Sequence, residues 1–256
     1  MSTRHGFNSQ VAATLDTASG PVFVKGLRQD HPRAWTQARE AAVNPRVRPV
    51  SAALLWRVTS AGWDLLGFEH LAGRGADFRP GSTDLPLVVD LLTALGRLRC
   101  PEVELKDAAR RWATYLDEPA DAVAFSGEAL LHTDLNHTNV LIARTGHRGI
   151  ARLVDWAWAT RGAAWIDPAC WVVWLISAGH HPREAERWAA GVPSWSSASA
   201  ADLNLFSTAQ AGLWRATAEE HPSGWTHQLR DAAARWAHHR HGGGIAAAPR
   251  SAGARA

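Results

Sequence analysis

The sequence predicts a two-lobed α+β fold, with a small β-rich N-terminal lobe and a mainly helical C-terminal lobe. Strand-like runs separated by short turns occupy most of residues 1–71, and helix-compatible runs occupy most of residues 72–241. A further strand-like hairpin, preceded by a polar loop, interrupts the helical part near residues 129–156. Residues 242–256 offer little apolar surface to bury, so we expect a disordered tail there.

Composition favours one globular unit and argues against several classes of protein. The chain has 256 residues, of which 46% are hydrophobic, and its two cysteines do not make a disulfide scaffold. The first ten residues lack the apolar stretch of a signal peptide, and the longest apolar run, at 169–178, is too short to cross a bilayer. We expect a soluble cytoplasmic protein without a membrane partner, either a monomer or a homodimer.

The charge distribution argues against a nucleic-acid partner. The formal net charge is +3, and residues 235–256 contain four arginines and no acid, which leaves −1 for the rest of the chain. A near-neutral body with a basic tail lacks the basic stripe that nucleic-acid binding requires. We therefore expect most of the 14 tryptophans in the core or lining a groove, not in a base-stacking platform.

The first hairpin of the N-terminal lobe joins strands predicted at Val11–Leu15 and Pro21–Lys25 through the turn at 16–20. Alternation in the second strand places Phe23 and Lys25 on one face. Lys25 is one of two lysines among 27 basic residues, and its compact ammonium suits a point contact with phosphate. The alternative is a strand-end lysine whose amine extends into water.

A helix is predicted next, starting after Asp30 with Pro32 in its first turn and ending near Val43. Its Glu40 lies fifteen residues after Lys25, a separation that a strand-to-helix return can close; an exposed surface glutamate is the alternative. Two more strands complete the lobe, at Ala53–Val58 and Trp63–Phe68.

The C-terminal lobe is predicted to consist mainly of helices. Their expected ranges are Leu85–Arg99, Glu102–Leu116, Pro168–Ser177, Arg183–Ala190, Ala200–Glu220 and Gly224–His239. Asp167 directly precedes Pro168, so we expect it to cap the N-terminus of that helix, with proline at the first helical position.

The polar loop before the second-lobe hairpin carries the residues with the clearest chemistry. Strands predicted at Val140–Ala143 and Ile150–Val154 fold Asp155 back beside Asp134 and Asn139. Two carboxylates and one amide oxygen suit Mg²⁺ shared with substrate phosphates, and a carboxylate left over could accept the proton of a hydroxyl nucleophile.

A rival interpretation takes His132, Asp134 and His137 as ligands of a dinuclear hydrolase. That site would need more histidines at short spacing, and the sequence lacks them.

Three spacings in this region resemble a known family. A His-Thr-Asp motif at 132–134, Asn139 five residues after the aspartate, and the pair Asp155-Trp156 are similar to the catalytic loop and metal-binding aspartate of the protein-kinase-like superfamily. The closest resemblance is to the aminoglycoside phosphotransferase family. It implies a protein-kinase-like fold.

The resemblance also implies a role for each residue of the loop. Asp134 would be the catalytic base, and Asn139 and Asp155 would bind Mg²⁺. His132 would hold the loop in shape, and Asp167 would tie the following helix to it.

The resemblance further implies a binding site for ATP or GTP. Lys25, positioned by Glu40, would contact the α- and β-phosphates, and Ser9 would lie in the loop that covers them. Phe68 and His70 fall at the connection between the lobes, where backbone groups would bind adenine.

The sequence departs from the family pattern at two positions of the loop. Thr133 stands where protein kinases have arginine and the phosphotransferases usually have glycine, which argues against control by phosphorylation of an activation loop. Asn136 stands where protein kinases have a phosphate-contacting lysine, and its role remains unassigned.

We expect transfer of the γ-phosphoryl group to a hydroxyl of a small molecule, an aminoglycoside or a related antibiotic. Eleven residues separate Asp155 from Asp167, too few for the segment with which protein kinases hold a peptide. Acids on the downstream helices could pair with ammonium groups of the substrate, although each is equally compatible with a solvated surface position. The alternatives are a kinase for choline, a sugar or homoserine, and a nucleotide-binding pseudokinase.

Overall fold

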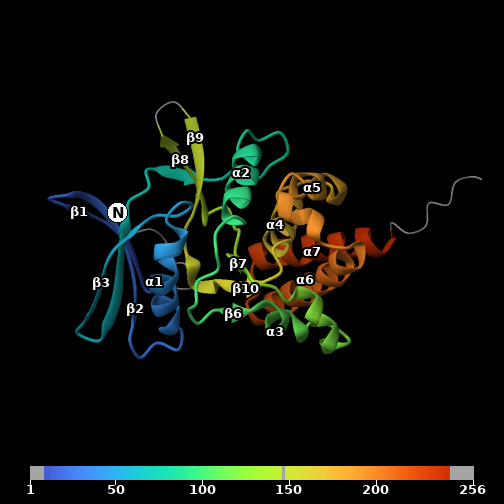
Figure 1. Ribbon diagram of the computed structural model, residues 1–256, viewed down its shortest axis with the longest axis horizontal. Coiled ribbons are helices and arrows are strands. Elements are labelled where there is room, and N and C mark those ends of the chain that lie inside the picture. Colours follow the sequence, from blue (N-terminus) through green and yellow to red (C-terminus); the bar gives the residue numbers. More distant parts are fainter. Residues whose placement is uncertain (1–8, 146–147, 243–256) are drawn as a thin grey trace, which may run out of the picture.

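The computed structural model describes residues 9–145 and 148–242, and it has the two-lobed α+β architecture expected from the sequence (Figure 1). The N-terminal part contains an antiparallel four-stranded sheet in the order β1-β2-β4-β3. Its strands are β1 (Val11–Thr17), β2 (Gly20–Arg28), β3 (Leu54–Ser60) and β4 (Trp63–Glu69). The predicted tail lies outside the described residues apart from Gly242.

Both hairpins of this sheet are confirmed, and both are longer than predicted. Thr17 pairs with Gly20, so the first turn is shorter than the five residues expected. In the second turn Ala61 and Gly62 have φ values of +49° and +80°, in agreement with the positive φ that a type I′ hairpin turn requires at both central residues. The register sets Lys25 in an inner strand, between Ala12 of β1 and Leu66 of β4.

Helix α1 (Trp35–Val47) begins later and ends later than predicted. Residues 31–34 form a turn instead of a first helical turn, with the amide of Ala34 bonded to the carbonyl of His31. The helix continues through Pro45, because its end is fixed by tertiary contacts. Asn44 supplies them: its amide donates to Ala52 O (2.8 Å) and its oxygen accepts from Leu54 N (2.7 Å).

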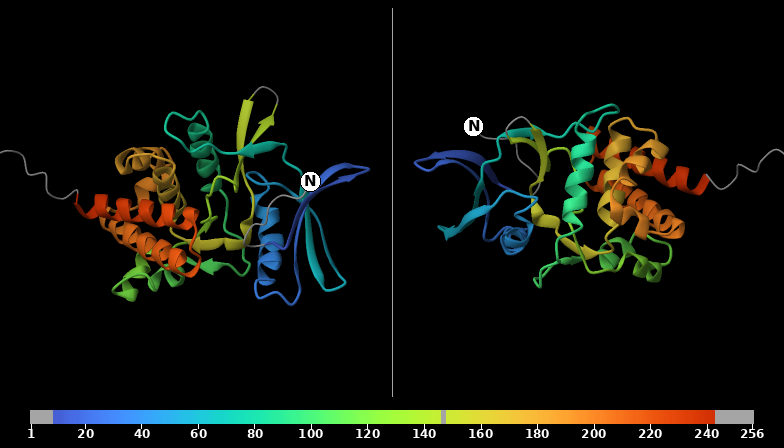
Figure 2. Two further views of the ribbon diagram at one scale, coloured as in Figure 1. Left: turned by 180° about the vertical axis from the view of Figure 1, so that it is seen from behind. Right: turned by 45° about the horizontal axis from the view of Figure 1, so that its top comes forward.

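The C-terminal part is mainly helical, as predicted, and is viewed from two further sides in Figure 2. Its helices are α2 (Leu85–Leu95), α3 (Ala108–Ala113), α4 (Ile166–Ser177), α5 (Pro182–Ala189), α6 (Ala200–Glu220) and α7 (Gly224–Gly242). Helix α4 is buried along nearly its whole length and packs against α5 and α7. No described helix is both long and apolar enough to cross a membrane.

The core of this part contains interlocked aromatic rings. Phe206 meets Trp112 and Trp165 edge to face, with ring centroids 5.0 and 5.3 Å apart. Trp112, Trp165 and Trp236 are all at most 3% exposed. These tryptophans are therefore core residues, as the charge distribution suggested.

The helix predicted at Glu102–Leu116 is mostly wrong. Lys106–Asp107 form a short strand, β6, which pairs in parallel with β10 (Thr160–Gly162), and only Ala108–Ala113 is helical. The amide of Lys106 donates to Ala159 O (3.1 Å), so a long-range contact competes with the helical pattern. Asp107 then caps α3 by accepting from Arg110 N (2.9 Å).

Two other helical elements also differ from the prediction. Helix α2 stops at Leu95, four residues earlier than expected, and the 3₁₀ helix η1 (Pro119–Phe125) was not predicted.

The predicted hairpin after the polar loop is confirmed as β8 (Val140–Thr145) and β9 (Arg148–Leu153). Strand β5 (Gly73–Gly75) joins its edge, and β7 (Ala129–Leu131), just before the polar loop, pairs with β10. Asp155 follows β9 and precedes the short 3₁₀ helix η2 (Trp156–Trp158).

The division into lobes at residue 71 remains a prediction. Val43 and Val47 of α1 belong to the large core that also contains the C-terminal helices. Val50 O accepts from Leu153 N (2.8 Å), so the segment after α1 is attached to β9. Helix α1 and the segment after it therefore contribute to joining the sheet to the helical part.

Candidate active site

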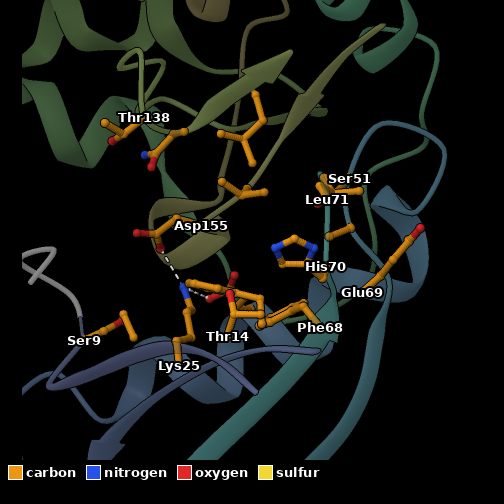
Figure 3. A pocket seen from close by; sticks show the side chains of 17 residues that line it. Ser9, Thr14, Lys25, Ser51, Phe68, Glu69, His70, Leu71, Thr138 and Asp155 are labelled. Atoms are coloured by element: carbon orange, nitrogen blue, oxygen red, sulfur yellow. Dashed lines mark hydrogen bonds and ion pairs between the residues drawn. The ribbon is translucent and has the colours of Figure 1, made fainter. Parts of the chain in front are cut away.

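A cavity of about 570 Å³ lies between the four-stranded sheet and the β8–β9 hairpin (Figure 3). Its walls include Thr14 of β1, Leu141 of β8 and Val154 after β9. The predicted site residues that line it are Ser9, Lys25, Glu40, Phe68, His70, Asn139 and Asp155. Asp134, His132 and Asp167 do not line it, but they contact one another or Asn139 in the polar loop beside it.

Lys25 joins the sheet to both α1 and the segment after β9. Its Nζ forms an ion pair with Glu40 and donates to Asp155 Oδ1 at 2.9 Å (Figure 3). Lys25 and Glu40 are 5% and 3% exposed, whereas the side chain of Asp155 is 25% exposed. Glu40 also accepts from Trp156 N at 3.3 Å. The spacing argument that brought Glu40 to Lys25 is therefore correct, and the surface alternatives for both are wrong.

This arrangement favours a charged lysine. Burial alone would lower the pKa of Lys25, but the negative charges of Asp155 and Glu40 outweigh burial and raise it. Burial alone would raise the pKa of Asp155, but the positive charge and the hydrogen bond of Lys25 outweigh burial and lower it. At neutral pH, Lys25 and Asp155 are therefore a cation and an anion facing the cavity.

Asp134 is held by two amide side chains of its own loop. Asn139 Nδ2 donates to Asp134 Oδ2 (2.9 Å) and to its backbone oxygen (3.0 Å), and Asn136 Nδ2 donates to Oδ1 (3.0 Å). Asn136 Oδ1 in turn accepts from the amides of Thr138 (2.8 Å) and Asn139 (2.9 Å). Asn136, which the sequence left without a role, therefore orients the carboxylate and closes the loop.

The environment makes Asp134 a stronger base than an ordinary aspartate. Burial and the nearby negative charge of Asp155 raise its pKa to about 6, although the hydrogen bonds from Asn136 and Asn139 act against this. A carboxylate with a pKa close to neutral is suited to accept a proton from a hydroxyl group.

His132 and Asp167 hold the polar loop in place through hydrogen bonds. The carboxylate of Asp167 accepts from the amides of His132 and Thr133, both at 2.8 Å. Buried His132 accepts from Asp134 N at Nδ1 (3.3 Å) and lies 3.0 Å from Val154 O at Nε2, which implies a neutral ring protonated on Nε2. Burial lowers the pKa of this ring, in agreement with a neutral state.

Asp167 does not cap its helix as we expected. Helix α4 begins at Ile166, so Asp167 lies in the first turn, and its side chain bonds the loop instead of its own helix. Asp167 instead makes the contact that the family resemblance implied, between this helix and the polar loop.

Thr133 adopts a conformation that explains the glycine common at this position. Its φ is +64°, in the left-handed region that β-branched residues rarely occupy. Its hydroxyl donates to Trp158 O (3.1 Å) and accepts from Arg111 Nη1 (2.6 Å). These two hydrogen bonds satisfy the hydroxyl group as donor and acceptor, and their free energy offsets part of the cost of the strained backbone.

The donor set suits Mg²⁺. Asn139 uses its NH₂ group on Asp134, and no described residue hydrogen-bonds its Oδ1, while Asp155 presents a partly exposed carboxylate to the same cavity. No group of three or more His, Cys, Asp or Glu in the described part of the chain is arranged to hold a metal. Two oxygen ligands are the usual protein contribution when Mg²⁺ keeps its waters and binds substrate phosphates.

Sequence reasoning missed residues that act across long separations. Ser51 lines the cavity, donates to Leu153 O (2.7 Å) and accepts from Trp156 Nε1 (3.1 Å). Arg111 contacts Thr133 over 22 positions. No local pattern distinguishes either residue, so the sequence contained no signal for them.

Comparison with known proteins gives relatives by structure and none by sequence. No family model and no curated protein sequence matches the chain. Among solved structures, a thermostable mutant of aminoglycoside phosphotransferase APH(4)-Ia, in complex with AMP-PNP and hygromycin B, aligns over 96% of this chain and 94% of its own, with a TM-score of 0.54 and 15% identity.

Two further structures are similar over most of their length. A microcompartment-associated aminopropanol kinase has a TM-score of 0.61 at 16% identity, with 94% of this chain and 90% of its own covered. The choline kinase LicA from Streptococcus pneumoniae has a TM-score of 0.59 at 12% identity, with 88% and 89% covered. The chain has the protein-kinase-like fold. The fold expected from the resemblance of residues 132–156 is thereby confirmed, and at these identities the likeness establishes the fold alone.

Proposed function

We propose that this protein is a phosphotransferase that moves the γ-phosphoryl group of ATP or GTP to a hydroxyl group of a small molecule. One observation carries the proposal: a buried lysine, paired with Glu40, shares a cavity with Asp155 and Asn139, and Asn139 binds the carboxylate of Asp134. These are the cation, the metal-binding oxygens and the base that phosphoryl transfer requires.

In this proposal each residue of the cavity has one task toward the nucleotide. Lys25 contacts the α- and β-phosphates, because its charge is fixed by Glu40 and directed into the cavity. Asn139 and Asp155 hold Mg²⁺, which when bound neutralises the phosphate charge. Phe68 and His70 line the same cavity, and the adenine or guanine ring binds beside them.

Asp134 acts on the acceptor. Its carboxylate, fixed by Asn136 and Asn139, accepts the proton of the attacking hydroxyl as the oxygen bonds to the phosphorus and the nucleoside diphosphate leaves. His132 and Asp167 do not touch the substrates and keep the loop in position.

The acceptor is proposed to be a hydroxylated amine, an aminoglycoside or a related antibiotic. Three structurally similar proteins are named for an aminoglycoside, choline and aminopropanol, and these compounds share hydroxyl and cationic nitrogen groups. The last two support the alternative, a metabolite kinase.

The test is nucleotide turnover with a panel of acceptors. Purified full-length protein is given ATP or GTP with Mg²⁺ and, separately, aminoglycosides, choline, aminopropanol, homoserine, sugars and a generic peptide. Release of the diphosphate and mass analysis for an added phosphate identify the acceptor, and Asp134→Asn is the matched inactive control. Phosphorylation of the peptide alone would contradict the proposal. Binding of ATP without Mg²⁺ dependence or turnover of any acceptor would favour a pseudokinase.

A further inference from the structure

Five side chains outside the cavity form a compact group of alternating cations and aromatic rings. They are Trp35 and Arg39 of α1, Lys106 of β6, Arg111 of α3 and Trp158 of η2, and we refer to them as the cation cluster. None of the five is among the described residues that line the cavity. The elements that carry them are far apart in the sequence, but in the fold α1 contacts η2 and α3 contacts β6.

The rings hold three positive charges close together. Lys106 Nζ lies 4.9 Å from the centroid of the Trp35 ring and 4.5 Å from that of Trp158. The guanidinium carbon of Arg39 lies 4.5 Å from the Trp35 ring, and that of Arg111 lies 5.4 Å from the Trp158 ring. Each ring therefore contacts two cations, and these contacts act against the burial that lowers the pKa of all three cations.

The cluster has no directly paired carboxylate among the described residues. Within the part of the chain that the structure describes, none of the three cations forms an ion pair. The acids that act on them from a greater distance are Glu104 on Arg39, and Asp134 and Asp167 on Arg111. Partial burial and the charges of Arg111 and Arg39 lower the pKa of Lys106 to about 8.

The cluster also contains unused hydrogen-bond donors. Arg39 Nη1 is buried and has no acceptor, and no described residue accepts a hydrogen bond from Lys106 Nζ. Trp35 is the first residue of α1, a helix with no capping side chain and no acid in its first turn. The positive end of the helix dipole therefore adds to the three charges.

We propose that the cation cluster binds a small oxyanion, a phosphate or phosphate monoester, at a site distinct from the nucleotide cavity. A phosphate accepts several hydrogen bonds and carries the charge that the three cations lack. Lys106 and Arg39 supply the unused donors, and Arg111 adds charge while its Nη1 stays bonded to Thr133.

The position of the site couples it to the loop of Asp134. Arg111 holds Thr133, the residue before Asp134, and Arg39 precedes Glu40 on α1. An anion bound to both arginines fixes α1 against that loop. The binding itself does not depend on the phosphotransferase proposal.

The first experiment is calorimetric titration of the nucleotide-free, full-length protein with inorganic phosphate, followed by glycerol phosphate. Lys106→Met should weaken binding of both by about tenfold, the loss expected for one charge-assisted hydrogen bond. Arg28→Met is the matched control, because Arg28 lies 5.9 Å from the Trp63 ring away from the cluster. Equal affinity in Lys106→Met and the unaltered protein, or an equal loss of affinity in Arg28→Met, would overturn the proposal.

The second experiment needs no variant and uses the fact that the chain has two lysines. Lys25 is locked in buried ion pairs, so an amine-reactive reagent at pH 8 should modify Lys106 first among the lysine side chains. Phosphate should slow modification of Lys106 several-fold, as measured by peptide mass spectrometry. Protection by phosphate and glycerol phosphate supports a general phosphate site. Protection by ATP alone would assign the effect to the nucleotide, and absence of protection would also refute the site.

Discussion

Replacing Lys25 by methionine should destabilise the protein in a strongly pH-dependent way. Methionine keeps the apolar stem but removes the charge that Glu40 and Asp155 share. The side chain of Asp155 is 25% exposed and retains some hydration, whereas Glu40 is 3% exposed. Glu40 is therefore the group that must take up a proton when its cation is lost.

The size of the effect follows from the cost of that proton. A glutamate with an ordinary pKa of 4.5 takes up a proton at pH 7 at a cost of about 3.4 kcal/mol, at about 1.36 kcal/mol per pH unit. Burial already raises the pKa of Glu40 with Lys25 present, so removal of the cation raises it further. A carboxyl group whose folded pKa is raised costs no stability below its unfolded pKa, and the cost grows as pH increases above it. Because the raised pKa of Glu40 means that the unaltered protein already bears part of this cost, we expect a loss of at most about 3 kcal/mol at pH 7 and less than about 1 kcal/mol at pH 5.

Urea denaturation of the two proteins at pH 5 and pH 7 measures this difference. The double variant Lys25→Met, Glu40→Gln should recover most of the loss at pH 7, because the neutral amide needs no proton. Arg28→Met, at the exposed end of the same strand, controls for loss of a positive charge and should change stability by less than about 1 kcal/mol at both pH values. An equal loss at both pH values, or no recovery in the double variant, would refute the reasoning.

Four further predictions concern the loop and the metal. Asp134→Asn should lower kcat by about 10²-fold to 10⁴-fold with little change in nucleotide affinity, as measured by steady-state kinetics and equilibrium binding; retained turnover would remove its role as base. Because the base must be ionised, kcat/KM of the unaltered protein should fall about tenfold per unit below a pH of about 6, and a flat profile to pH 5 would contradict the pKa assigned to Asp134. Asp155→Asn, or excess EDTA, should weaken turnover, with added Mg²⁺ restoring only the EDTA-treated protein. Thr133→Ala should lose about 1–2 kcal/mol in urea denaturation and Thr133→Gly less, since glycine removes the cost of a positive φ; the reverse order would show that strain is unimportant there.

The sequence predicted the polar loop and its hairpin well because their geometry is local. The loop from Asp134 to Asn139 is closed by hydrogen bonds over at most five residues, and β8 and β9 are adjacent in the chain. Lys25 and Glu40 are only one strand-to-helix connection apart. Residue type and spacing are therefore sufficient to bring most of the site together.

The errors occur where distant segments determine local structure. Composition alone favours a helix through Lys106, but the pairing of Lys106 with Thr160 makes a strand there. The end of α1 is set by Asn44 bonding to the strand that follows, which no helix signal encodes. Arg111 could not be predicted for the same reason, because its contacts with Thr133 and Trp158 join positions 22 and 47 residues apart.

Backbone strain occurs at two residues of the site, and contacts from both parts of the protein hold it in place. In the described part of the chain, the non-glycine residues with positive φ are Ala61, Thr133 and Asp155, and the last two flank the site. Such conformations persist where surrounding contacts impose them. Asp167 binds the amide of Thr133, and Lys25 binds the carboxylate of Asp155. The two strained residues are thus held from opposite sides, one by a helix of the C-terminal part and one by the N-terminal sheet, so the geometry of the site depends on both parts being in place.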